Sequence, residues 1–195
     1  SNFIKNCEVL KNNYETMKVT EGLIKKTNKN ILLLTFDDGL KDHLYVAEIL
    51  HKYGLKATFY IPVQPYIEKE ILPVHKAHLI CSKVGGESLE ILKKTISDLG
   101  YNFADILEKE KLEKYSSKYN VHNDDARIKE FKRIINYYGS LKFRIKILDN
   151  ILTKLSINIK SAQFYLSPRE IKHIDSLGHE IGSHGLSHTL LSRLS

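Results

Sequence analysis

The sequence predicts an α/β fold with parallel strands, interrupted by a long helical segment. The stretch ILLLTF, residues 31–36, is continuously apolar and runs into Asp-Asp-Gly, as expected of a strand buried on both faces of a sheet. A helix and a second strand are predicted directly after it, and another helix–strand pair is predicted near the C-terminus. Residues 64–160, between these two regions, have a helical pattern almost throughout.

The first α/β region has the pattern strand, helix, strand. After Gly39, apolar residues recur at helical spacing up to Tyr53, and Gly54 is placed to end the helix. KATFYIP, residues 56–62, then alternates, with Ala57, Phe59 and Ile61 on one face. This order is typical of a parallel βαβ unit.

The second α/β region, residues 161–195, repeats the helix and strand. Ser167 is a candidate N-cap, Pro168 suits the first helical position, and Glu170 completes a capping box. The helix is expected to end at Gly178, and HEIGSH, residues 179–184, is predicted to be the next strand. The α/β core therefore occupies residues 1–63 and 161–195, on either side of the helical insertion.

The helical insertion contains three apolar stripes at helical spacing. They are Leu89, Leu92, Ile96 and Leu99; Ile128, Phe131, Ile135 and Tyr138; and Leu141, Ile145, Leu148, Leu152 and Leu155. We interpret them as internal packing, with a lid over the site or an oligomer contact as a further role. His75 and His78 are more typical of an ordinary helix face than of a site mouth or a second ion site.

Composition excludes several function classes. The chain has 195 residues and a formal net charge of +7, but its lysines are dispersed, so no nucleic-acid partner is expected. Its two cysteines support neither a disulfide framework nor a CxxC metal site. Apolar runs are too short for a membrane span and no signal peptide is visible, so a cytoplasmic location is expected.

Two pairs of polar residues follow predicted strands at the carboxyl edge of the sheet, where ligands bind in parallel α/β folds. Asp37 and Asp38 repel each other unless a cation compensates them. His184 and His188 follow another strand and are close enough in sequence to bind one ion. One carboxylate and two imidazoles would make a zinc-type site, leaving the other carboxylate as a base. Taken singly, each pair is also compatible with a solvated turn or with surface histidines.

These motifs together resemble one known family. TFDDG, YGLKATFYIP and LGHEIGSHGLSH are similar to the conserved segments of the polysaccharide deacetylase family, also called the NodB-homology or carbohydrate esterase 4 family. The resemblance covers residues 31–62 and 165–195. It implies a distorted, TIM-like (β/α) barrel and the hydrolytic removal of acetyl groups from an N-acetylated sugar of a surface polysaccharide or its precursor.

The resemblance also implies roles for four residues. Asp37 matches the catalytic base, while Asp38, His184 and His188 match the ligands of a divalent metal, usually zinc and sometimes cobalt or nickel. The family usually has Ser or Thr directly after the first histidine, where this chain has Gly185. Ser187 or Thr189 is therefore the candidate to supply that hydroxyl.

The family's later motifs, including the histidine that acts as general acid, do not follow in this sequence. We therefore expect a partial barrel of NodB type, truncated after the His-x-x-x-His motif. Two alternatives stay open at this point. One is a catalytically incomplete fragment that acts as a metal- or glycan-binding module. The other is a magnesium-binding phosphoryl-transfer fold, which would not use His184 and His188.

Overall fold

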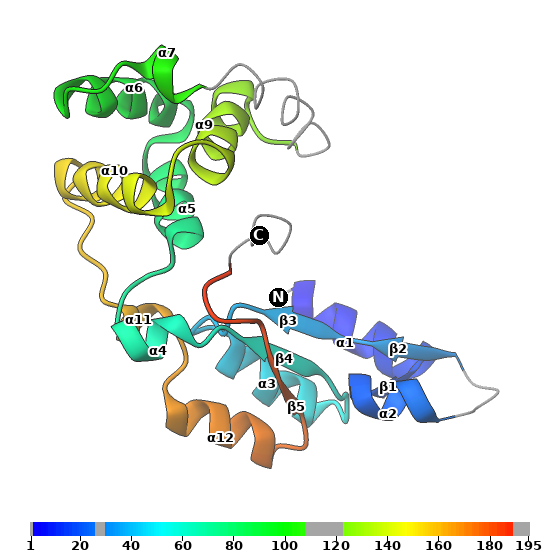
Figure 1. The fold of residues 1–195 in the computed structure, drawn as a ribbon. Coiled ribbons are helices and arrows are strands. Elements are labelled where there is room, and N and C mark those ends of the chain that lie inside the picture. Colours follow the sequence, from blue (N-terminus) through cyan, green and yellow to red (C-terminus); the bar gives the residue numbers. More distant parts are fainter. Residues whose placement is uncertain (1, 26–29, 108–122, 189–195) are drawn as a thin grey trace. The chain divides into compact units, whose positions relative to one another are not determined.

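The computed structural model describes residues 2–25, 30–107 and 123–188, which form a mixed α/β structure (Figure 1). The chain divides into two compact units. We call Ser1–Glu70 together with Ile159–Ser195 the core unit, and Ile71–Asn158 the helical unit. Among the described residues, we find no helix with the length and apolarity needed to cross a membrane.

The core unit contains all the strands that the structure describes. They are β1 (Glu15–Met17), β2 (Ile31–Leu33), β3 (Thr35–Asp37), β4 (Thr58–Ile61) and β5 (Glu180–Ser183). Its helices are α1 (Asn2–Asn13), α2 (Val19–Ile24), α3 (His43–Lys52), α4 (Gln64–Glu68), α11 (Ser161–Phe164) and α12 (Pro168–Ser176). Strands β1 and β2 form a parallel pair, and β3, β4 and β5 form a parallel sheet in that order (Figure 1).

The predicted α/β class with parallel strands is confirmed, and β3, α3 and β4 form the expected strand–helix–strand unit. The prediction for residues 31–36 is wrong in one respect. They form two short strands that are only partly buried, and Leu33 is 40% exposed. The reason is that β3 lies at an edge of the described three-stranded sheet and that β2 pairs only with β1. The central strand β4 is more deeply buried, and its Phe59 is 0% exposed. A barrel is not confirmed.

Helices α3 and α12 pack on the face of the sheet that carries Phe59. The apolar residues buried there come from both helices, from β4 and from the segments beside them: Ala47, Leu50, Leu55, Ala57, Phe59, Ile61, Leu166 and Ile174. Helix α12 begins as the sequence predicts, because the Ser167 hydroxyl accepts from the Glu170 amide and the Glu170 carboxylate accepts from the Ser167 amide. This capping box satisfies amide groups that a helix start leaves unpaired.

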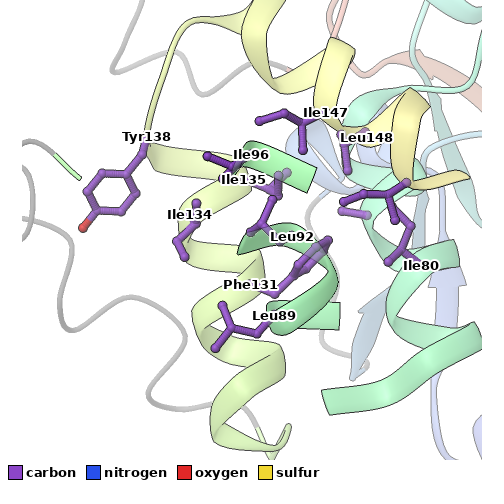
Figure 2. Packing of buried hydrophobic residues seen from close by; sticks show 12 residues of the cluster. Ile80, Leu89, Leu92, Ile96, Phe131, Ile134, Ile135, Tyr138, Ile147 and Leu148 are labelled. Carbon is purple, nitrogen blue, oxygen red and sulfur yellow. The ribbon is translucent and has the colours of Figure 1, made fainter. Parts of the chain in front are cut away.

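The helical unit has a separate hydrophobic core. The helices that the structure describes in it are α5 (Pro73–Val84), the 3-10 helix η1 (Gly85–Glu87), α6 (Ser88–Asp98), α7 (Phe103–Ile106), α9 (Ala126–Tyr137) and α10 (Leu141–Lys154). Figure 2 shows side chains of α5, α6, α9 and α10 converging, among them Ile80, Leu92, Phe131 and Leu148. Helices are therefore confirmed at all three predicted stripes.

The buried face of α10 differs from the predicted one. Ile147, Leu148 and Ile151 are buried, whereas Leu141 is 41% exposed. Of the predicted stripe, only Leu148 is fully buried. Leu152 and Leu155 of the predicted stripe are partly buried against the same core, so the predicted face overlaps the buried face, which is shifted toward Ile147 and Ile151.

Two histidines are buried beside Phe59 in the core unit. The rings of His43 and His179 lie 5.8 Å and 5.5 Å from the Phe59 ring, centroid to centroid. His179 is 1% exposed, and its Nε2 lies 3.0 Å from the carbonyl oxygen of Ala47. Burial lowers the pKa of both imidazoles, because the charged form loses its hydration.

We predict that the free energy of unfolding falls as the pH drops below 6.5. The unfolded chain then binds protons at these histidines, with an ordinary pKa of 6.5, while the folded chain, in which both pKa values are lowered, binds fewer. Each such histidine contributes at most about 1.4 kcal/mol per pH unit. Urea unfolding at pH 7.5 and pH 5.5 should show a smaller loss of stability in His179→Gln than in the parent. Equal losses in both proteins would contradict the assignment to His179.

Candidate metal centre

Asp37, Asp38 and Gly39 form a sharp turn at the carboxyl end of β3. Asp37 is the last residue of the strand, and the next two residues have positive φ, +78° at Asp38 and +60° at Gly39. A glycine suits this position because a side chain would be strained there. It would also approach Ile61, whose Cδ1 lies 3.0 Å from the place of a Cβ at residue 39.

The segment with His184 and His188 follows β5 and is held by backbone hydrogen bonds to the end of β4. The His184 amide donates to the Ile61 carbonyl (2.9 Å), and the amides of Val63 and Gln64 donate to the carbonyls of Gly185 (3.2 Å) and Leu186 (2.8 Å). His184 therefore leaves the sheet at a position fixed by the central strand.

Gly185 has a φ of +74° and stands where the resemblance noted in the sequence led us to expect a hydroxyl residue. Its amide donates to the hydroxyl of Ser183, at 3.3 Å. The hydroxyl that contacts this turn thus belongs to Ser183, the residue before His184. The sequence analysis did not consider Ser183 for this role. Of the two predicted substitutes, Thr189 lies outside the described residues.

Asp38, His184 and His188 come together across the sheet edge. Oδ1 of Asp38 lies 3.5 Å from Nε2 of His184 and 3.5 Å from Nε2 of His188, and the two imidazole centroids are 5.0 Å apart. One potential ligand atom from each residue lies within 4.8 Å of the others. The side chains are 21–34% exposed, so solvent reaches the site.

The donor set fits a divalent metal ion. In a tetrahedral site with ligands about 2.1 Å from zinc, ligand atoms lie about 3.4 Å apart, close to both distances from Asp38. Two imidazole nitrogens and one carboxylate oxygen are ligands that zinc accepts, and a fourth position would remain for water. Among the residues that the structure describes, no other group of three His, Cys, Asp or Glu side chains brings its ligand atoms together in this way.

Asp37 lies beside this group and is exposed. It pairs in register with Tyr60 of β4, which pairs with Gly182 of β5. Paired residues of parallel strands point to the same face, so Tyr60 shares the face of Asp37. Its ring covers Gly182, where a Cβ would come within 2.5 Å of Tyr60 Cδ1. The sequence analysis did not consider Tyr60 as a neighbour of Asp37, although the alternation around Phe59 already placed it opposite the buried face.

His75 and His78 lie on α5 of the helical unit, with ring centroids 6.4 Å apart. His75 is buried and His78 is exposed. They form a pair on one helix face and belong to no group of three potential ligands in the described part of the chain.

Comparison with known proteins decides the family. A family model described as polysaccharide deacetylase matches residues 24–195. The chain belongs to the polysaccharide deacetylase family. No curated protein and no solved structure matches it.

Membership in the polysaccharide deacetylase family confirms the resemblance inferred from TFDDG and HEIGSHGLSH. The match runs through the helical unit and includes both α/β regions. A deacetylase domain implies a glycan substrate and hydrolysis, and it replaces the phosphoryl-transfer alternative.

We predict that Gly39→Ala destabilises the deacetylase core unit more than Gly54→Ala does. Both glycines have positive φ, so each alanine costs about 1–2 kcal/mol in backbone strain. Gly54 has nothing within 4 Å of its missing Cβ, whereas Gly39→Ala must also displace Ile61. Urea unfolding of the two variants measures the difference. Equal losses would show that Ile61 yields without cost.

Proposed function

We propose that this chain is a metal-dependent deacetylase that removes the acetyl group from an N-acetylated sugar of a surface polysaccharide or its precursor. The observation that carries the proposal is the convergence of Asp38, His184 and His188 at one sheet edge, in a chain of the polysaccharide deacetylase family. Hydrolysis of the amide adds water across the C–N bond and yields acetate and a free amino sugar.

Asp38, His184 and His188 would hold the ion. Zinc suits this set of ligands best, and cobalt and nickel also accept imidazole and carboxylate. When bound, the ion would polarise the acetyl carbonyl and lower the pKa of water. Exposure of the three side chains leaves room for the substrate to approach from solvent.

Asp37 is the proposed general base. It ends β3 next to the ligand Asp38, and its carboxylate is exposed, so it can reach an attacking water molecule. A neighbouring cation favours the ionised form of a carboxylate, which is the form that accepts a proton. Asp37 would take that proton while the water oxygen bonds to the acetyl carbon.

For the domain organisation, we propose a deacetylase core made of residues 1–63 and 161–195, with residues 64–160 as a helical insertion. The division into a core unit and a helical unit supports this proposal, with boundaries at residues 70 and 159. The insertion would act as a lid over the glycan or as an oligomer contact.

We predict that the purified chain, loaded with zinc and freed of excess, retains about one equivalent, as expected for a single site of three ligands. Asp38→Ala, His184→Ala and His188→Ala should each lose it, because two ligands bind the ion too weakly. Elemental analysis measures the metal content. His78→Ala, which removes an exposed imidazole from the helical unit, is the matched control and should keep the ion. Full metal content in the ligand variants would refute the site.

We predict that Asp37→Asn keeps the metal but lowers the rate of deacetylation at least about 100-fold, since the amide cannot accept the proton. Acetate release from an N-acetylglucosamine oligomer measures the rate, and elemental analysis of the same sample measures the metal. A wild-type chain that binds zinc and the oligomer but releases no acetate would favour the binding-module alternative. Equal rates in the parent and Asp37→Asn would exclude Asp37 as the base.

A further inference from the structure

We propose that Lys41 and Glu170 are positioning residues of the metal centre. Their ion pair, together with backbone hydrogen bonds beside it, holds the turn of Asp38 and Gly39 in the geometry that metal binding requires. The inference rests on the proposed function of Asp38 as a metal ligand and assigns a role to two residues that lie outside the ligand group.

The turn is held by the segment that precedes α12. The Leu166 amide donates to the Gly39 carbonyl (2.9 Å), and the Lys41 amide donates to the Phe164 carbonyl (2.9 Å). Between these bonds, Leu40 and Tyr165 form an isolated antiparallel bridge. The first of these bonds is made one residue after Asp38. Any shift of residues 164–166 therefore moves the Gly39–Leu40 peptide, the one that follows the Asp38–Gly39 peptide beside the Asp38 side chain.

The ion pair lies at the end of this backbone contact. Nζ of Lys41 is 2.7 Å from Oε2 of Glu170, and Glu170 Oε2 also accepts from the Ser167 amide at 2.6 Å. The Lys41 ammonium and the Ser167 amide lower the pKa of Glu170 to about 2, so its carboxylate is ionised at neutral pH. One carboxylate thus joins the loop after Asp38 to the start of α12.

Helix α12 connects this contact to the other ligands. It leads through Gly178 into β5, which ends at Ser183 just before His184. The loop of His184 is itself held by Val63 and Gln64, as described above. The turn of Asp38 is therefore held by residues 164–166, and the loop of His184 is held by residues 63–64. In the chain, these two segments lie on either side of residues 71–158.

The φ of +78° at Asp38 requires contacts that hold the backbone of this turn. A non-glycine residue in this region is strained and persists only where its surroundings fix it. Exposed ion pairs contribute little to folding stability, and Lys41 is 44% exposed. By contrast, residues that orient metal ligands change metal affinity strongly. A positioning role therefore predicts a large effect on zinc affinity with a small effect on folding.

The test compares Lys41→Met and Glu170→Gln with the parent. We expect the zinc dissociation constant, measured by competition with a chromophoric chelator, to rise roughly tenfold in each variant. The double variant should show little more than either single one, because both remove the same contact. Lys41→Arg keeps the charge and should restore most of the affinity. Thermal unfolding in excess chelator should differ little among these proteins.

Lys154→Met provides the matched control. Lys154 pairs with Asp98 in the helical unit at the same 2.7 Å and with a similar exposure, 42%. Its zinc affinity should equal that of the parent. If the parent binds zinc and Lys41→Met binds it equally well, the positioning role is wrong while the proposed metal site stands. If the parent binds no zinc, the proposed function fails and this inference fails with it.

Discussion

Parallel pairing of β3, β4 and β5 is the constraint on which the rest of the core unit depends. The register joins Asp37 to Tyr60 and Tyr60 to Gly182, so β3 and β5 end at the same edge with one strand between them. Adjacent strands lie about 4.8 Å apart, so the two outer strand ends are about 10 Å apart. An aspartate beyond β3 and a histidine beyond β5 can then meet above β4. Neither motif forms a site without this pairing.

Much of this arrangement follows from local sequence patterns. Burial of Phe59, the capping box at Ser167 and the glycine turns depend on residues close in the chain, so spacing and residue type predict them. The polar pairs after the strands were predicted for the same reason. Their meeting at one edge follows from the general rule that parallel strands align their carboxyl ends.

Features that depend on long-range packing could not be predicted this way. The run at residues 31–36 has the composition of a central strand, but its two halves each pair with one strand only, β2 with β1 and β3 with β4, and this pairing depends on residues outside the run. Helix α10 carries apolar residues on several faces, and only contact with α5, α6 and α9 selects Ile147 and Ile151. Glu170 was predicted as a cap, and its second contact, with Lys41, joins residues far apart in sequence.

Backbone strain concentrates at the candidate ligands. The described non-glycine residues with positive φ are Asp38, Lys69, Ser156 and His188, and two of these four are in the ligand group. Strain of this kind persists where surrounding contacts fix the chain, and it is common at functional sites. At Asp38 those contacts are the hydrogen bond at Gly39 and the neighbouring Lys41–Glu170 pair. The loop of His188 has the bonds from Val63 and Gln64. Because contacts within the fold hold these turns, we expect ion binding to require little further ordering, and the affinity of the proposed site to depend also on residues that do not touch the ion.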